Sequence, residues 1–331
     1  MDNIQDIVDK LKTPSNIAII THRNPDGDAI GSSLGLKLFL DQGAHKCDVI
    51  LPSEFPKVFH YLPEIGGATV YDLEKDKTKQ ILKHADIIFC LDFNSLDRID
   101  PLALDINESE AYKVMIDHHI DPEPFADWYM SDTESSSTCE LIYRFIELLD
   151  DKNKSVNVDI ATCLFTGILT DTGSFKYATN PEVYRIASEL KRIGVDDYQI
   201  NDNIFNSWTA RQMSILGHSL RNRLQLMPEH HAGIISLTKA DYQKYQIARG
   251  DTEGLVNYIL MIKGMKVAAF IREMPHGEIR LSLRSKGEIS VQDLARTHFS
   301  GGGHKNASGG SSTDSLEDTI AKFKEVLPAF L

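Results

Sequence analysis

Residues 16–28 read NIAIITHRNPDGD, and this stretch decides the expected fold. Its first part, Asn16–His22, is rich in isoleucine, so we expect it to form a buried β-strand. A Pro-Asp-Gly-Asp turn follows, and Ala29–Leu40 then has the apolar spacing of a helix that ends at Gly43. A buried strand that leads through a polar turn into a helix is typical of an α/β sheet.

The same pattern recurs in the first half of the chain. Asp86–Asp92 and Lys113–Asp117 are short runs in which isoleucine and valine are prominent, so both are expected to be buried strands. Ser137–Leu149 has the spacing of an amphipathic helix, and Asp159–Thr170 that of a largely buried one. This alternation predicts a parallel sheet covered by helices on both faces.

The second half of the chain has a different sequence pattern. Residues from about Pro181 to Leu220 are helical and polar in pattern, and they are expected to connect two domains. Beyond them we expect three strands, a hairpin turn, a glycine- and serine-rich loop and a final helix: His231–Leu237, Met265–Arg272 and Glu278–Arg284, the turn Met274–Gly277, the loop Ser300–Ser312 and the helix Asp314–Leu331. The expected architecture is a two-domain α/β protein with a parallel-sheet domain at residues 1–190, a helical linker at 191–215 and a smaller mixed-sheet domain at 216–331.

The composition is that of a globular protein, with 42% apolar and 25% charged residues in a chain of 331. Residues 1–12 have the spacing of an amphipathic helix and lack the apolar core of a signal peptide. No apolar run approaches the roughly 18–20 residues that a membrane helix needs. The four cysteines have no CxxC spacing, which is typical of reduced thiols. We therefore expect a cytoplasmic protein without a membrane partner.

The formal net charge is −13, which argues against binding to long duplex nucleic acid. Lys and Arg side chains that neutralise phosphates supply most of the affinity for such polymers. A small anionic substrate stays compatible with this charge if metal ions or a local basic cluster offset the global field. The charge thus predicts cations at any site that handles phosphate.

Acidic residues gather at the carboxyl ends of the expected strands and at the end of one expected helix. In open parallel sheets these ends border one crevice, so the segments are expected to converge there. Five carboxylates in one crevice would raise one another's pKa values unless cations lay among them. Carboxylates with imidazoles and no thiolate favour divalent ions, Mn²⁺ above all. The residues of this set are His22, Asp26, Asp28, Asp92, Asp117, His118, His119 and Asp171.

These residues, in this order, resemble the first four motifs of the DHH phosphoesterase superfamily. Near the end of the chain, Gly301-Gly302-Gly303-His304 is similar to the glycine-rich signature of the DHHA1 domain. The resemblance covers nearly the whole chain. The length and the Ser282–Ser285 segment make it most similar to the bacterial oligoribonuclease and 3′-phosphoadenosine-5′-phosphate phosphatase subgroup.

The resemblance implies two metal ions per chain, Mn²⁺ with Mg²⁺ or Co²⁺ as substitutes. By its motifs, His22 and Asp26 would hold the first ion, and Asp92 would bridge to the second. The remaining ligands of the second ion would be Asp28, His118 and Asp171. Asp117 would orient a histidine by hydrogen bonding. His119 would face the scissile phosphate as a ligand or as the general acid, and Arg98 would contact the substrate.

In the second domain, the resemblance implies that the backbone of Gly301–Gly303 approaches an anion closely. Arg284 and His304 would then hold a terminal phosphate through charge-assisted hydrogen bonds. The local charge agrees with this hypothesis, because residues 284–305 hold four Lys or Arg against two acids in an otherwise acidic protein. The cleft between the two domains would be the substrate site.

The expected function is hydrolysis of short oligonucleotides to mononucleotides, removal of the 3′-phosphate of 3′-phosphoadenosine-5′-phosphate, or both. One alternative is a phosphodiesterase that acts on cyclic di-AMP or on its linear product pApA. An alternative of another class is a non-catalytic nucleotide sensor. The expected partners are short single-stranded oligonucleotides or small nucleotides, and a homodimer is kept as one option for the assembly.

Overall fold

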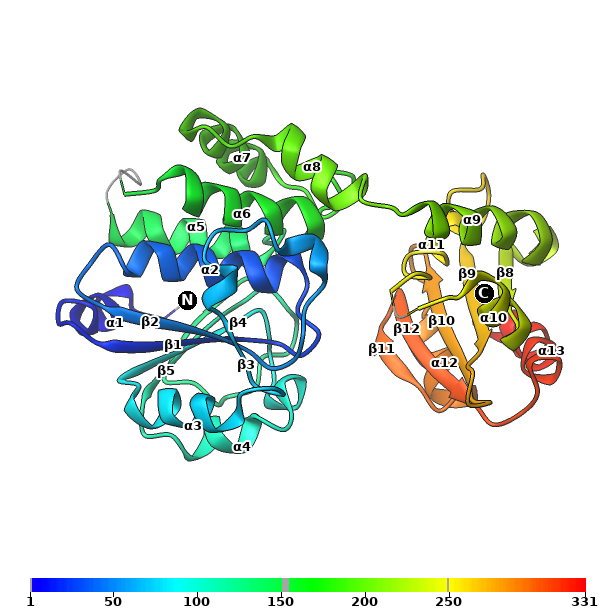
Figure 1. Cartoon of the computed structure of the whole chain (residues 1–331), viewed down its shortest axis with the longest axis horizontal. Helices are drawn as coiled ribbons and strands as arrows, with labels where there is room; N and C mark the ends of the chain where they lie inside the picture. The colour runs from blue at the N-terminus through cyan, green and yellow to red at the C-terminus, as the bar shows by residue number, and fades with distance from the viewer. Residues whose placement is uncertain (1, 151–154, 249) are drawn as a thin grey trace. The chain divides into compact units, whose positions relative to one another are not determined.

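The computed structural model describes residues 2–150, 155–248 and 250–331. Within these ranges the chain forms two compact units, Met1–Ser207 and Trp208–Leu331. Each unit is built on a six-stranded sheet with its own hydrophobic core (Figure 1). This confirms the expected two-domain α/β fold.

The sheet of the first unit is parallel throughout, in the order β3-β2-β1-β4-β5-β6. The chain moves outward from β1 in one direction and then returns to β4 on its other side, so the strand order reverses between β1 and β4. In sheets of this kind the crevice at the reversal is the usual binding place. The strands are β1 (Asn16–Thr21), β2 (Lys46–Leu51), β3 (Thr69–Val70), β4 (Ile87–Leu91), β5 (Tyr112–Asp117) and β6 (Trp128–Ser131).

Helices cover both faces of this sheet, as predicted. Figure 1 shows α2, α5 and α6 on one face and α3 and α4 on the other. The helices are α1 (Ile4–Lys10), α2 (Gly27–Leu40), α3 (Lys75–His84), α4 (Ala103–Glu108), α5 (Thr138–Leu149), α6 (Val158–Asp171), α7 (Pro181–Ile193) and α8 (Asp197–Phe205).

Side chains of β1 alternate between two cores because successive residues of a strand point to opposite faces. Ile17 and Ile19 belong to the core that α2, α5 and α6 cover. Ala18 and Ile20 belong to the core under α3 and α4. The strand is therefore apolar along its whole length, as a strand buried on both faces must be.

Glycines allow α2 and α6 to approach closely. Gly27, Gly31 and Gly35 recur every four residues and so share one face of α2. A Cβ atom on Gly31 would lie 2.4 Å from the carbonyl oxygen of Cys163. On the facing helix, a Cβ on Gly167 would lie 2.9 Å from the Cα atom of Asp28 in α2. The two helices therefore pack backbone against backbone directly behind the carboxyl edge of the sheet.

The second unit has a mixed sheet in the order β11-β12-β10-β9-β8-β7, in which only β8 and β9 pair in parallel. Its core is again divided by the sheet, with Ala269 facing the cluster under α12 and α13 and Phe270 facing the other. The elements are α9 (Ala210–His218), β7 (Leu224–Met227), β8 (Ala232–Leu237), α10 (Lys239–Tyr245), α11 (Asn257–Leu260), β9 (Val267–Glu273), β10 (Ile279–Ser285), α12 (Val291–His298), β11 (Gly302–His304), β12 (Ala307–Ser312) and α13 (Leu316–Val326).

The expected hairpin is present, because β9 and β10 pair antiparallel across a turn in which the amide of Gly277 donates to Met274. The prediction of a loop at Ser300–Ser312 is wrong, because this segment contains the strands β11 and β12. Its small residues are explained by packing: a Cβ on Gly310 would lie 2.8 Å from the carbonyl oxygen of Phe299, just after α12. The sequence analysis also missed β2, β3, β6 and β7.

We predict that Gly31→Ala lowers the free energy of unfolding by about 1–3 kcal/mol, the usual cost of overpacking. Alanine improves helix propensity by about 1 kcal/mol, but its Cβ would meet a backbone carbonyl that does not move without shifting α6. Gly217→Ala in α9 is the matched control, because no heavy atom outside the local helix backbone lies within 4 Å of the added Cβ. Denaturant unfolding of the full chain compares them, and equal midpoints for wild type and Gly31→Ala would contradict the prediction.

Candidate active site

The candidate site lies at the carboxyl edge of the first sheet, where the strand order reverses. His22 follows β1, Asp92 follows β4, and Asp117 ends β5. Asp28 lies in the first turn of α2, and Asp171 is the last residue of α6. The segments that the sequence analysis placed in one crevice do converge.

Three groups of three side chains each bring one ligand atom per residue within 4.8 Å of one another. One consists of Asp92, His118 and His119, and the other two are the candidate ligand sets. The first set is His22, Asp26 and Asp92, and the second set is Asp28, His118 and Asp171. These are the two sets that the resemblance implied.

The first set is organised around the ring of His22. Its Nδ1 lies 2.9 Å from the carbonyl oxygen of Arg23, so Nε2 faces the carboxylates. Nε2 is 3.3 Å from Asp92 Oδ2 and 3.9 Å from Asp26 Oδ1. Asp26 also caps α2, because its Oδ1 accepts from the amides of Asp28 and Ala29. The side chain of Asp26 is therefore both a helix cap and a candidate metal ligand.

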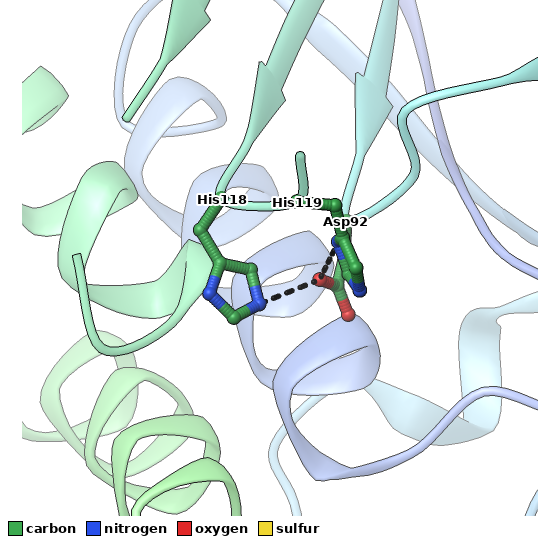
Figure 2. Close-up of side chains that lie close together, drawn as sticks. All are labelled: Asp92, His118 and His119. Atoms are coloured by element: carbon green, nitrogen blue, oxygen red, sulfur yellow. Dashed lines mark ion pairs between the residues drawn. The ribbon is translucent and has the colours of Figure 1, made fainter. Parts of the chain in front are cut away.

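The second set is organised around the ring of His118. Its Nε2 lies 3.4 Å from Asp171 Oδ2 and 4.0 Å from Asp28 Oδ2. The same atom is 3.6 Å from Asp92 Oδ1 (Figure 2). Asp92 therefore faces His22 with one oxygen and His118 with the other, which places its carboxylate between the two sets. Asp92 holds this position with a φ of +64°, an uncommon conformation for a residue other than glycine.

His119 points toward the same carboxylate but has a partner of its own. Its Nδ1 is 2.7 Å from Asp117 Oδ1, and its amide donates to Asp117 Oδ2 at 3.0 Å. Because an ionised carboxylate only accepts, Nδ1 carries the proton of this hydrogen bond. Asp117 is fully buried, so it fixes the plane of the His119 ring.

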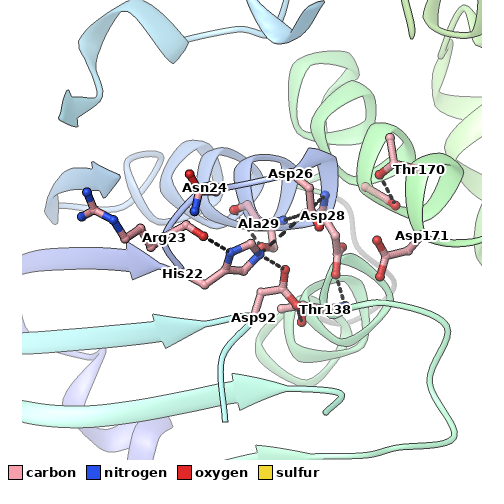
Figure 3. Close-up of polar contacts among 12 residues, drawn as sticks. His22, Arg23, Asn24, Asp26, Asp28, Ala29, Asp92, Thr138, Thr170 and Asp171 are labelled. Carbon is pink, nitrogen blue, oxygen red and sulfur yellow. Dashed lines mark hydrogen bonds and ion pairs between the residues drawn. The ribbon is translucent and has the colours of Figure 1, made fainter. Parts of the chain in front are cut away.

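The start of α5 contacts both sets, as Figure 3 shows. The amides of Thr138 and Cys139 donate to Asp28 Oδ2 and Oδ1 at 2.6 and 2.8 Å. The hydroxyl of Thr138 donates to Asp92 Oδ1 at 3.0 Å. The sequence analysis missed Thr138, and its only signal was its place after Ser137, the residue that caps α5.

The cluster is electrostatically unbalanced. Burial, together with the charge of Asp92, raises the pKa of Asp28 to about 7. Burial and the neighbouring aspartates raise the pKa of Asp171 well above its usual range. Burial opposes ionisation of Asp92, but the hydrogen bond and charge of His22 lower its pKa to about 2. Burial likewise opposes the charge of His22, yet the hydrogen bond with Asp92 raises the pKa of that imidazole to about 9. The raised pKa values of Asp28 and Asp171 reflect a repulsion among carboxylates that cations among them would relieve.

The donor set fits divalent metal ions. Each set offers carboxylate and imidazole atoms close together, and no thiol belongs to either. Such donors suit Mn²⁺ or Mg²⁺ better than a structural zinc site, which more usually contains cysteine.

Arg98 lies in a short 3₁₀ helix after β4, and its carbonyl oxygen accepts from the amide of Arg23. Its Nη1 is buried, and it has no hydrogen-bond partner among the residues that the structure describes. A buried donor without a partner is costly, which is compatible with a ligand contact.

The second-unit residues lie on three adjacent strands. Arg284 of β10 pairs with Ala307 of β12, and Ala307 pairs with His304 of β11. The side chain of His304 lies outside what the structure describes. Gly303 has a φ of +137°, and a Cβ there would lie 2.7 Å from the carbonyl oxygen of Ala307. A Cβ on Gly302 would meet nothing within 4 Å, so its backbone is open to approach.

Two family models match the chain. That of the DHH family, N-terminal domain, matches residues 16–168, and that of the DHHA1 domain matches residues 236–331. No helix among the residues that the structure describes is both long enough and apolar enough to cross a membrane.

Curated relatives are similar over most of the chain. A bifunctional oligoribonuclease and PAP phosphatase from Thermus thermophilus is 30% identical, over 88% of this chain and 83% of its own length. The cyclic-di-AMP phosphodiesterase of Listeria monocytogenes is 22% identical over 98% of this chain but only 48% of its own.

Solved structures share the fold. The crystal structure of an exopolyphosphatase-related protein from Bacteroides fragilis has a TM-score of 0.96 and 37% identity, covering 99% of this chain and 96% of that one. The exonuclease RecJ bound to manganese has a TM-score of 0.54 at 13% identity, with 100% and 96% covered. From the two matching domains and the extent of these similarities, the chain belongs to the DHH family with a DHHA1 domain.

Proposed function

We propose that this protein is a two-metal phosphoesterase that hydrolyses short oligonucleotides to mononucleotides, removes the 3′-phosphate of 3′-phosphoadenosine-5′-phosphate, or does both. The observation that carries the proposal is the position of Asp92 between the two ligand sets, with His22 and His118 at its two oxygens. The curated relative that is 30% identical has both activities in its name.

In this proposal His22, Asp26 and Asp92 hold one ion, and Asp28, His118 and Asp171 hold the other, with Asp92 shared. Two Mn²⁺ ions, or Mg²⁺ or Co²⁺ in their place, would supply Lewis-acid polarisation of the phosphate and activation of water. The protein keeps the six side chains in place through the cap of α2, the start of α5 and the close packing of α6.

His119 would act on the phosphate itself. Its Nδ1 proton is held by Asp117, so Nε2 is the ring nitrogen that would carry a proton to the leaving oxygen or donate to a phosphate oxygen. Arg98, whose buried Nη1 lacks a described partner, would supply a further donor to the substrate.

The second unit would hold a terminal phosphate with Arg284, His304 and the backbone of Gly302 and Gly303. Burial lowers the pKa of the Arg284 guanidinium, and no acidic side chain among the described residues forms an ion pair with it. A partly buried cation of this kind gains from an anionic ligand.

Hydrolysis of cyclic di-AMP or pApA is the second candidate, because a relative named for cyclic di-AMP aligns with nearly the whole chain. A panel of short oligonucleotides, 3′-phosphoadenosine-5′-phosphate, cyclic di-AMP and pApA, run with Mn²⁺ and resolved by chromatography, ranks these substrates. Binding without turnover of any of them would instead support a nucleotide sensor.

Asp92→Asn should abolish turnover while the fold stays intact, because a neutral amide bridges two cations poorly. Hydrolysis and bound Mn²⁺ are measured on the same preparation. Asp48→Asn, which alters a half-buried aspartate on β2 of the same sheet, is the control and should keep both. Near-full activity with two metals per chain in Asp92→Asn would overturn the assignment.

His119→Ala should leave the metal content nearly unchanged but slow hydrolysis by roughly 10²–10⁴-fold, the scale of a lost general acid or electrostatic contact. His118→Ala, by contrast, should lose metal. Metal analysis beside steady-state kinetics separates the two roles. If His119→Ala loses metal as readily as His118→Ala, His119 is a ligand.

Arg284→Ala should raise KM for a 5′-phosphorylated dinucleotide by roughly 10–100-fold, which corresponds to a charge-assisted hydrogen bond of about 1.5–3 kcal/mol. Arg280→Ala is the matched control, since Arg280 lies on the same strand but is paired with Glu278 at the surface. Bis-p-nitrophenyl phosphate, which has no terminal phosphate to hold, should respond far less.

A length series tests the same hypothesis in the wild type. Activity should fall beyond about five nucleotides, because the net charge of −13 disfavours long polyanions. Equal losses on reporter and dinucleotide in Arg284→Ala would assign Arg284 to structure, and undiminished digestion of a 24-mer would exclude a length limit.

A further inference from the structure

The first turn of α5 contacts one carboxylate from each ligand set. The leading amides of any helix have no partner within the helix, so they are available to an outside acceptor. In α5 two of these amides, those of Thr138 and Cys139, are taken by the two oxygens of Asp28. This fixes both the position and the plane of the Asp28 carboxylate, although Asp28 is 110 residues away in the chain.

The side chain of Thr138 makes the second contact. Its hydroxyl donates to Asp92 Oδ1 at 3.0 Å, and neither residue is more than 2% exposed. Oδ1 is the oxygen that faces His118 at 3.6 Å, whereas Oδ2 faces His22 at 3.3 Å. The hydroxyl therefore acts on the end of the Asp92 carboxylate that is turned toward the second set.

The geometry leaves little freedom on either side of this hydrogen bond. Threonine is β-branched, so few rotamers are open to its hydroxyl in a helix. The backbone of Asp92 is in the left-handed region, and its amide donates to Ile116 of β5. The rotation of the carboxylate about its own bond is the freedom that remains, and the Thr138 hydroxyl restricts it.

We propose that Thr138 is a positioning residue that holds the two ligand sets in a fixed arrangement. Its amide orients the carboxylate of Asp28, and its hydroxyl orients the carboxylate of Asp92. This inference rests on the proposed two-metal function. Thr138 touches neither substrate nor metal in this scheme. It acts through the two carboxylates, so its loss should be seen in metal binding as well as in turnover.

Thr138→Val is the decisive variant, because it removes the hydroxyl and keeps the shape and the amide. Mn²⁺ binding by isothermal titration calorimetry should weaken by about 10–100-fold for at least one ion, the usual effect of removing a group that orients a ligand. kcat should fall on the same scale with KM little changed. Thr138→Ser, which restores the hydroxyl, should return Mn²⁺ affinity to within a few-fold of wild type.

Thr78→Val is the matched control. Thr78 is also fully buried near the start of a helix, α3, but its hydroxyl donates to the carbonyl oxygen of Glu74, the residue just before that helix. It should bind Mn²⁺ as the wild type does. Circular dichroism and the unfolding midpoint are recorded for every variant, so that a loss of fold is recognised.

The outcomes separate this inference from the proposed function. A wild type that binds no Mn²⁺ would overturn the two-metal proposal itself. A wild type that binds two ions, beside a Thr138→Val variant with unchanged affinity, would overturn only the role of Thr138. If Thr138→Val does not fold, Thr138→Ala takes its place: unchanged Mn²⁺ affinity overturns the role, and a loss that Thr138→Ser restores supports it.

Discussion

The repulsion among five aspartates gathered at one edge of a sheet is the constraint on which the rest of the site depends. Asp28, Asp92 and Asp117 are almost wholly buried, and Asp171 lies beside them. The protein offsets this charge in three ways: imidazoles face Asp92, backbone amides of α5 hold Asp28, and the amide and ring of His119 hold Asp117. The negative charge that these groups do not offset would be neutralised by protons or by divalent ions.

The same atoms that balance charge also hold the fold together. Asp28 lies between the start of α5 and Gly167 of α6, where a Cβ would come within 2.7 Å of its Oδ1. Asp26 starts α2 and faces His22. Packing and chemistry are therefore coupled here: side chains that cap or join helices are also the candidate ligands, and the glycines of α2 and α6 allow the helices to come near enough to be joined.

The strands that carry the site, and most of the site residues, could be predicted from the local sequence pattern alone. The strands that carry the site are Ile- and Val-rich, and their polar ends had to meet once a parallel sheet was assumed. Three kinds of feature escaped. β2, β3 and β6 have weak or short patterns, and the strands at 302–312 are made of small residues that are typical of loops. Thr138 escaped because its role depends on two contacts across the fold, with partners 110 and 46 residues away.

An acidic protein that is proposed to bind small polyanions needs local departures from its average charge. In the first unit, the side chains of the aspartate cluster are mostly acidic, so bound cations would be needed to make that region attractive to an anion. The second unit provides such a departure without metal, because Arg284 is partly buried and lies two strands from the glycine strand β11. Many basic side chains are engaged by acids, as Arg185 is by three glutamates. Within the basic stretch 284–305, Lys305 is likewise paired with Glu288. Among the described residues, Arg284 forms no ion pair with an acidic side chain, and its Nη1 donates to the carbonyl oxygen of Leu283. In the proposed function, the net charge of −13 would disfavour long anions, while Arg284 would hold the end of a short one.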